Sequence, residues 1–304
     1  MSDAAAELKK KFLKRDRVLR VITKDGKFRA AAIKNTEIAR IAQQRHALDP
    51  LAATLLARLM SGASLMSSFL KGEERITIET DSTGVIKLLF AESLQVGEVR
   101  GFVRYAKDAG ERPVATIGDA LGIGLLKVSK VQYNQPEPTT GIVQLIKGDI
   151  STDLAYYLRQ SEQIPSAVVL DVDVDDSGKI AHSAGLLVQA MPGATEAEVK
   201  KIMDSIRELP SLAELLGTGY NPEEILRQAL PMEFDVTSST PIDFYCRCSL
   251  DRFKEMLMTL GISEIEDMQK QGQNELICQY CNEHYYLSEN DFDVMLAETR
   301  ARTN

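Results

Sequence analysis

The four cysteines of this 304-residue chain fall in two tight pairs near its C-terminal end. One residue separates Cys246 from Cys248, two residues separate Cys278 from Cys281, and 29 residues lie between the pairs. Zn²⁺ prefers four tetrahedral soft ligands, and two short chelating arms supply four thiolates at modest entropic cost. The spacing therefore predicts that all four thiolates hold one zinc ion in the reduced protein, and that His284 is not needed as a ligand.

The one-residue spacing of the first pair indicates a second kind of chemistry. In an extended segment, residues i and i+2 point to the same side with Cα atoms about 6.6 Å apart, near the upper limit for a disulfide. Cys246 and Cys248 can thus bind zinc in one backbone shape, while a disulfide between them needs another. Because zinc keeps thiols deprotonated and open to oxidants, oxidation is expected to eject the metal and unfold the module. The alternative to such a redox site is a zinc ribbon whose metal only stabilises a small domain.

The sequence around the cysteines predicts the elements that must hold them. Ser249 can cap a helix over 250–260 that Gly261 ends, Ser263 with Glu266 opens a second short helix, and a last helix begins near Ser288. A unit of about 60 residues is only marginally stable on its own core. Structural zinc contributes about 10 to 16 kcal/mol in finger peptides, so removal of the metal is expected to unfold this unit.

The residues upstream of this unit predict an α+β domain with antiparallel sheets. Hairpins are expected over 18–33, with a type I′ turn at Asp25 and Gly26, and over 76–90. Helices are expected over 36–48 and 50–70, the second one buried in the core. Strands in antiparallel arrangement that alternate with few helices favour α+β over a doubly wound fold.

Short capped helices follow from about residue 193. Thr195 with Glu198 is predicted to form a capping box at the first helix, and Ser211 with Glu214 a second capping box at the next helix. A third helix starts in PEEILRQAL. The segment 231–241, with a proline at each end, is predicted to be a linker. These features predict three domains: an α+β core domain over 1–192, a helical linker domain over 193–236 and a zinc-binding switch domain over 237–304.

Composition excludes several classes of function. A net charge of −8 disfavours a protein that binds nucleic acid through a basic face. The apolar segment 50–70 contains Arg58, which disfavours a membrane span, and the N-terminal segment lacks the apolar core of a secretory signal. A cytoplasmic protein is therefore expected, and in that reducing compartment clustered cysteines favour a metal site. No catalytic signature is visible, so the chain is not expected to be an enzyme.

Two rival functions are disfavoured by the residues near the cysteines. A zinc-ribbon module that binds nucleic acid needs basic residues there, but acidic residues such as Asp251, Glu255 and Glu283 are found instead. A thiol oxidoreductase needs one exposed CxxC at the start of a helix, whereas these four cysteines form one set.

The cysteine pattern in FYCRCSLDRFKEM and ICQYCNEHYYL, together with SAGLLVQAMPGA (183–194) and YYLRQSEQIPS (156–166), resembles the heat shock protein 33 family. Members are bacterial redox-regulated holdase chaperones, also called 33 kDa chaperonins. The resemblance extends from about Arg17 to Leu296. It implies that the reduced form holds zinc and is inactive. It also implies that oxidation forms Cys246–Cys248 and Cys278–Cys281 disulfides, releases zinc, and unfolds the switch and linker.

The resemblance also implies partners. The oxidised protein would form a homodimer, bind unfolding client proteins without ATP, and later release them to ATP-dependent foldase chaperones. The linker helices carry an apolar face that only a docked partner can cover, and loss of the switch would uncover it. Candidate residues for client contact are Ile202, Ile206, Leu212 and Leu215.

Overall fold

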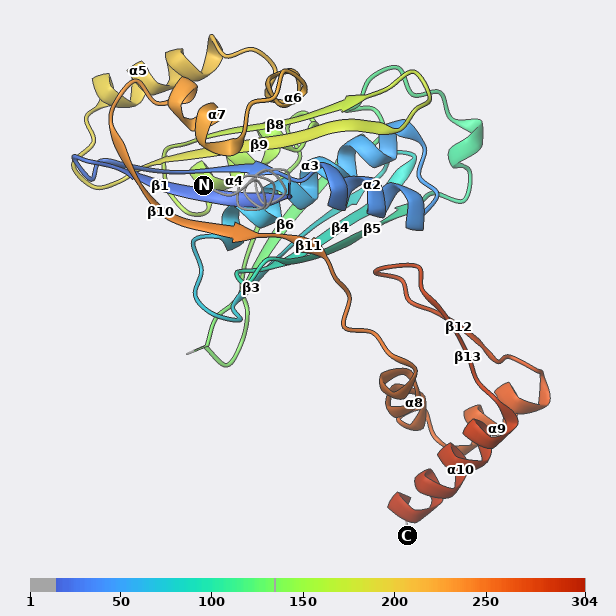
Figure 1. The fold of residues 1–304 in the computed structure, drawn as a ribbon. Coiled ribbons are helices and arrows are strands. Elements are labelled where there is room, and N and C mark those ends of the chain that lie inside the picture. The colour runs from blue at the N-terminus through green and yellow to red at the C-terminus, as the bar shows by residue number, and fades with distance from the viewer. Residues whose placement is uncertain (1–14, 134, 304) are drawn as a thin grey trace, which may run out of the picture. The chain divides into compact units, whose positions relative to one another are not determined.

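The computed structural model describes residues 15–133 and 135–303, which form a mixed α+β structure (Figure 1). Most of the N-terminal segment in which the sequence predicts no secretory signal, residues 1–14, lies outside this part. The chain divides into two compact units, Met1–Tyr245 and Cys246–Asn304. The predicted α+β class with antiparallel sheets is confirmed, while the predicted boundaries of three domains stay a prediction.

The first unit contains two sheets whose pairings are antiparallel except for the short pairing of β11 with β5. Sheet A has, in spatial order, β10 (Phe234–Pro241), β1 (Arg17–Thr23), β2 (Phe28–Lys34), β9 (Ile180–Ala190) and β8 (Ser166–Val174). Sheet B has, in spatial order, β11 (Asp243–Phe244), β5 (Glu98–Tyr105), β4 (Ile86–Leu94), β3 (Arg75–Ser82), β6 (Gly124–Val131) and β7 (Thr139–Gln144). A 3₁₀ helix, η1, spans Ala109–Glu111.

The central helix of this unit is α3 (Pro50–Ser67), accompanied by α2 (Thr36–Arg45) and α4 (Ser151–Gln160). Asp49 accepts hydrogen bonds from two N–H groups of its first turn, and Pro50 occupies that turn, as the sequence predicts. Side chains of α3 such as Leu55 and Leu59 are fully buried in one core that includes residues of both sheets. The predicted core helix is confirmed, and no helix in the described ranges is long and apolar enough to cross a membrane.

Both predicted hairpins are present as β1–β2 and β3–β4, but the type I′ turn is wrong. A type I′ turn needs positive φ at both central residues, and here Gly26 has φ +70° while Asp25 is not among the positive-φ residues. Instead, the Thr23 hydroxyl lies 2.6 Å from Asp25 Oδ1 and accepts the N–H of Phe28 at 3.0 Å. These side-chain bonds hold a longer loop in place of the two-residue turn.

Three helices, α5 (Glu196–Arg207), α6 (Leu212–Gly217) and α7 (Pro222–Ala229), pack on sheet A and share a second apolar cluster with it. Thr195 and Glu198 form the predicted capping box. Ser211 is the N-cap residue of α6, but the predicted capping box is wrong, because the Ser211 side chain makes no capping hydrogen bond; the backbone N–H of Leu212 is donated to Asp171 Oδ2 of β8 at 2.7 Å. The first turn of α6 is therefore stabilised by a side chain of sheet A rather than by a capping side chain next to the helix.

The predicted linker over 231–241 is also wrong. Its residues form β10, which pairs with β1 along the whole strand, from Arg17 opposite Pro241 to Thr23 opposite Phe234. Backbone hydrogen bonds stabilise this edge strand, so it needs few apolar side chains. The chain thus returns from the three helices through the core sheet before it reaches the cysteines.

The second unit contains α8 (Leu250–Met258), α9 (Ile262–Lys270), the hairpin of β12 (Glu275–Ile277) and β13 (His284–Tyr286), and α10 (Glu289–Thr303). Ser249 caps α8 by accepting the N–H of Arg252, as predicted. The predicted opening of the next helix at Ser263 is wrong, because Gly261 is the N-cap residue of α9. The buried apolar core of this second unit is small and consists of Ile265, Leu287, Phe292, Met295 and Leu296.

Candidate metal and redox site

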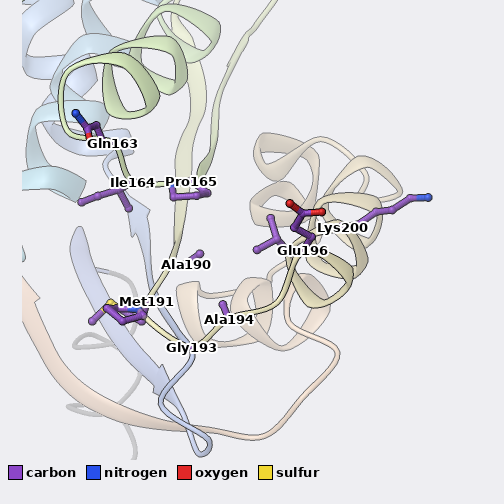
Figure 2. A pocket seen from close by; sticks show the side chains of 11 residues that line it. Gln163, Ile164, Pro165, Ala190, Met191, Gly193, Ala194, Glu196 and Lys200 are labelled. Carbon is purple, nitrogen blue, oxygen red and sulfur yellow. The ribbon is translucent and has the colours of Figure 1, made fainter.

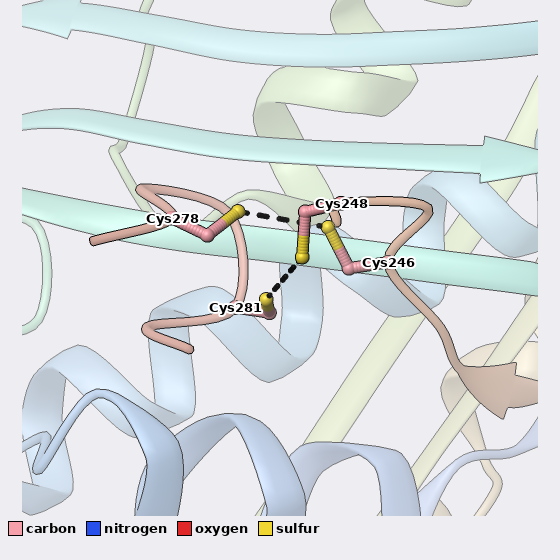
Figure 3. Close-up of side chains that lie close together, drawn as sticks. All are labelled: Cys246, Cys248, Cys278 and Cys281. Carbon is pink, nitrogen blue, oxygen red and sulfur yellow. Dashed lines mark hydrogen bonds between the residues drawn. The ribbon is translucent and has the colours of Figure 1, made fainter. Parts of the chain in front are cut away.

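The four cysteines lie on two segments of the second unit that face each other (Figure 3). Cys246 and Cys248 are on the irregular stretch before α8, and Cys278 and Cys281 are in the turn between β12 and β13. That turn is closed by two backbone hydrogen bonds, from Cys278 to the carbonyl of Glu283 and from Asn282 to the carbonyl of Cys278. The β12–β13 hairpin therefore positions Cys278 and Cys281, and the segment that leads into α8 positions Cys246 and Cys248.

The four sulfur atoms all lie within 4.8 Å of one another. The Sγ atoms are 3.7 Å apart for Cys246 and Cys278, and 3.4 Å apart for Cys248 and Cys281. A tetrahedral zinc site with Zn–S bonds of 2.3 Å has sulfur atoms about 3.8 Å apart. No disulfide joins these four cysteines in the part of the chain that the structure describes, so the donor set and its spacing fit a zinc ion.

His284 is held away from this role by a different contact. Its Nδ1 atom lies 2.8 Å from Oε1 of Glu275 on the paired strand, and the histidine side chain is 42% exposed. The cluster of possible metal ligands in the described ranges contains the four cysteines without it.

Burial shapes the electrostatics of the second cysteine pair. Cys278 and Cys281 are 3% and 1% exposed, and burial raises the pKa of both thiols. Opposing this, the backbone N–H groups of Tyr280 and Cys281 are directed at the sulfur of Cys278, and that of Glu283 at the sulfur of Cys281. Buried thiolates therefore need a further positive charge, which a divalent metal ion would supply.

Sequence reasoning missed one residue of this site, Tyr285 on β13. Its hydroxyl lies 3.2 Å from both the Sγ atom and the carbonyl oxygen of Cys248, and the hydrogen bond to Cys248 raises the pKa of Tyr285. The ring of Phe253 on α8 lies 5.5 Å away, centroid to centroid. A tyrosine in a short strand has no signature of its own, so only the fold could bring it to the cysteines.

The four candidate residues for client contact are buried between the helices and sheet A. Ile202 and Ile206 of α5 are 2% and 8% exposed, and Leu212 and Leu215 of α6 are 0% and 9% exposed. They belong to one apolar cluster with residues of sheet A such as Phe28. The predicted apolar face is thus present and covered, and its contact with clients stays a prediction.

A cavity of about 590 Å³ lies where β9 leads into α5 (Figure 2). Apolar residues from the turn before β8 and from the end of β9 form most of its wall, including Ile164, Pro165 and Met191. Glu196 and Lys200 of α5 are its charged residues. Its lining contains no cysteine, histidine or serine, so this cavity lacks the metal-ligating and nucleophilic side chains that are gathered at the four thiols.

Comparison with known proteins gives one consistent family. A family model described as Hsp33 protein matches residues 16–288. The "33 kDa chaperonin" of Syntrophotalea carbinolica is 37% identical over 289 residues, covering 93% of this chain and 100% of that protein. The "33 kDa chaperonin" of Bacillus subtilis is 32% identical over 289 residues, covering 93% of this chain and 99% of that protein.

A solved structure supports the same assignment at the level of the fold. The crystal structure of the 33 kDa chaperonin (heat shock protein 33 homolog) from Thermotoga maritima matches with a TM-score of 0.84 and 30% sequence identity. The match covers 94% of this chain and 99% of that one.

Proposed function

Because this chain belongs to the Hsp33 protein family, we propose that it is an ATP-independent holdase chaperone that a four-cysteine zinc switch keeps inactive until it is oxidised. The family and the names of the relatives support a chaperone function. The observation that carries the redox part is the cluster of four cysteine thiols, whose sulfur atoms lie within 4.8 Å of one another. In this proposal the chain is not an enzyme, and it works in the cytoplasm.

In the proposed reduced state, Cys246, Cys248, Cys278 and Cys281 hold Zn²⁺ as thiolates. The ion would supply the positive charge that buried sulfur atoms need. Backbone N–H groups from the turn after β12 orient the second pair, and the hydroxyl of Tyr285 contacts Cys248. With the metal bound, the small unit over 246–304 would gain the stability that its few buried apolar residues do not provide.

In the proposed oxidation, Cys246 bonds to Cys248 and Cys278 bonds to Cys281. Each disulfide removes two thiolates, so the site can no longer hold the ion. The shortest sulfur contacts in the structure join the two arms. However, those contacts depend on the folded arrangement of the two arms, and once the arms separate, the partner within the same arm has the higher effective concentration. This argument supports pairing within each arm.

The proposed result of oxidation is an exposed apolar surface. Unfolding of the switch would release the segment that follows β10, and the helices α5 to α7 would then leave sheet A. Their buried face, with Ile202, Ile206, Leu212 and Leu215, is the proposed surface for unfolding client proteins. A homodimer of the oxidised chain and later transfer of clients to ATP-dependent foldase chaperones complete the proposal. The domain boundaries proposed for this behaviour are 1–192, 193–236 and 237–304.

The proposal is tested by aggregation of a heat-denatured client, measured by light scattering with the reduced and the hypochlorite-oxidised chain. We expect suppression only by the oxidised chain, and loss of that suppression when a thiol reductant restores the cysteines in the presence of zinc. Equal protection by the reduced, zinc-loaded chain would contradict the proposal and would favour a structural zinc module.

A further inference from the structure

We propose that the hydroxyl of Tyr285 restrains the thiolate of Cys248 and thereby sets how readily the first cysteine pair is oxidised. The inference rests on the proposed function, because it assigns a positioning residue to the same switch. Its basis is the contact of 3.2 Å between the tyrosine hydroxyl and the Sγ atom of Cys248.

The direction of this hydrogen bond follows from the charge of the sulfur. A neutral thiol could donate its proton to the hydroxyl, but a thiolate has no proton to give. The hydroxyl is then the donor, and the bond to the charged sulfur of Cys248 is stronger than a neutral one. The carbonyl oxygen of Cys248 also accepts from this hydroxyl at 3.2 Å, so the single proton is shared between the two acceptors, and the charged sulfur is the stronger acceptor of the two.

The position of the hydroxyl is fixed by both arms of the site. Tyr285 lies on β13, where it is paired with Leu276 of β12, the strand that leads to Cys278. Its ring contacts the ring of Phe253, which lies on α8 just after the first cysteine pair. The hydrogen bond therefore joins the arm of the second pair to the arm of the first.

Cys248 and the second cysteine pair each have a hydrogen-bond donor that the structure identifies. The sulfur atoms of Cys278 and Cys281 accept backbone N–H groups, which belong to the turn itself. Cys248 has a side-chain donor, the hydroxyl of Tyr285. Removal of the Tyr285 hydroxyl therefore takes away a donor of Cys248 and leaves the backbone donors of the second pair in place.

The chemical step shows why this donor matters. With hydrogen peroxide, one thiolate attacks an oxygen atom, an S–O bond forms, the O–O bond breaks and hydroxide leaves. The second thiolate then attacks that sulfur, an S–S bond forms, the S–O bond breaks and a second hydroxide leaves. Two thiolates lose two electrons, and the peroxide gains them. Cys248 is the attacking thiolate in one of these steps, whichever cysteine reacts first. A donated hydrogen bond withdraws electron density from its sulfur and slows that step.

The test compares the full-length, zinc-loaded, reduced chain with two variants. Tyr285→Phe removes the hydroxyl and keeps the ring against Phe253. Tyr286→Phe is the matched control. The hydroxyl of Tyr286 donates to Glu275 Oε1 at 3.0 Å, away from the cysteines, and the side chain of Tyr286 is exposed. Iodoacetamide alkylation of each cysteine is followed by mass spectrometry, and zinc release under peroxide is followed with a chelating dye.

We expect Tyr285→Phe to alkylate Cys248 and to release zinc under peroxide about tenfold faster than the wild type, whereas Tyr286→Phe stays unchanged. Alkylation of Cys278 and Cys281 should not change. An unchanged rate at Cys248, or equal acceleration at all four cysteines, would overturn the inference, since a general loosening of the unit gives the second result.

A second variant, Phe253→Leu, keeps the hydroxyl but removes the ring that fixes its direction. It should accelerate alkylation of Cys248 by a smaller factor, and it keeps the inference testable if Tyr285→Phe does not fold. The same experiments distinguish failure of this inference from failure of the proposed function. A wild-type chain that binds no zinc overturns both, while a wild-type chain that switches normally beside an unchanged Tyr285→Phe overturns the inference alone.

Discussion

At the scale of single residues, the spacing of the cysteines identified the candidate site because metal chelation is local in sequence. Four thiols in two short arms have few arrangements, and the structure brings their sulfur atoms together. Tyr285 could not be identified in the same way. Its role depends on the pairing of β12 with β13, which places a strand residue beside a cysteine 37 positions earlier.

The first prediction concerns zinc binding. Replacing Cys246 and Cys248 together by serine should abolish stable zinc binding and loosen residues 246–304, because two weak oxygen ligands replace two thiolates. Zinc content and limited proteolysis measure both effects. His284→Ala is the control and should retain one zinc ion, since the histidine contacts Glu275 instead of the sulfur atoms. A compact double variant with bound zinc would contradict the assigned ligands.

The second prediction concerns Asp16, which is buried and accepts the N–H of Ile38 at 2.9 Å in the first turn of α2. Burial raises the pKa of Asp16 from 3.8 to about 6 despite this hydrogen bond. The folded chain therefore holds the proton more tightly than the unfolded chain, and stability falls as the pH rises from about 4 to 6. The loss for a shift of this size is about 3 kcal/mol.

Urea denaturation at pH 4.5 and 7.5 measures this effect. Asp16→Asn should remove most of the fall in unfolding free energy between the two pH values. Asp25→Asn is a control of opposite sign, because the hydrogen bond from Thr23 lowers the pKa of Asp25 and its contribution is lost as the pH falls. The same pH dependence in Asp16→Asn and the wild type would contradict the assignment.

At the scale of elements, the sequence predicted those parts of the fold that carry strong local patterns. The hairpin β1–β2, the capped helix α3 and the capping box of α5 are examples. The strand β10 was missed because its stability comes from backbone pairing with β1, while its polar side chains are typical of a linker. The cap of α6 was missed because its acceptor, Asp171, lies 41 positions away in sequence.

The third prediction follows from this cap. Asp171→Ala should weaken the attachment of α6 to sheet A by about 1 kcal/mol, since it removes the acceptor for the N–H of Leu212. Faster hydrogen exchange in α6 and partial chaperone activity of the reduced chain are expected. Asp173→Ala is the matched control, because that carboxylate lies on the same strand near His182. Unchanged exchange in α6 would contradict the role of Asp171.

At the scale of the whole molecule, the chain combines two units whose buried apolar cores differ greatly in size. The first, Met1–Tyr245, buries α3 between two sheets, whereas the second, Cys246–Asn304, has a small apolar core and four thiols. A unit of that size depends on a metal or another crosslink for its stability. We therefore expect loss of the metal to unfold the second unit and to release α5 to α7 from sheet A, while α3 and the two sheets of the first unit remain folded.

The measurement that tests this account most directly is a stepwise oxidation of the reduced, zinc-loaded chain with hypochlorite. Zinc released, free thiols remaining and suppression of client aggregation are determined in the same samples. The account predicts that about one zinc ion leaves as four thiols are lost, and that chaperone activity rises in proportion to the zinc released. Full activity before any zinc is released, or complete loss of thiols with the zinc still bound, would contradict it.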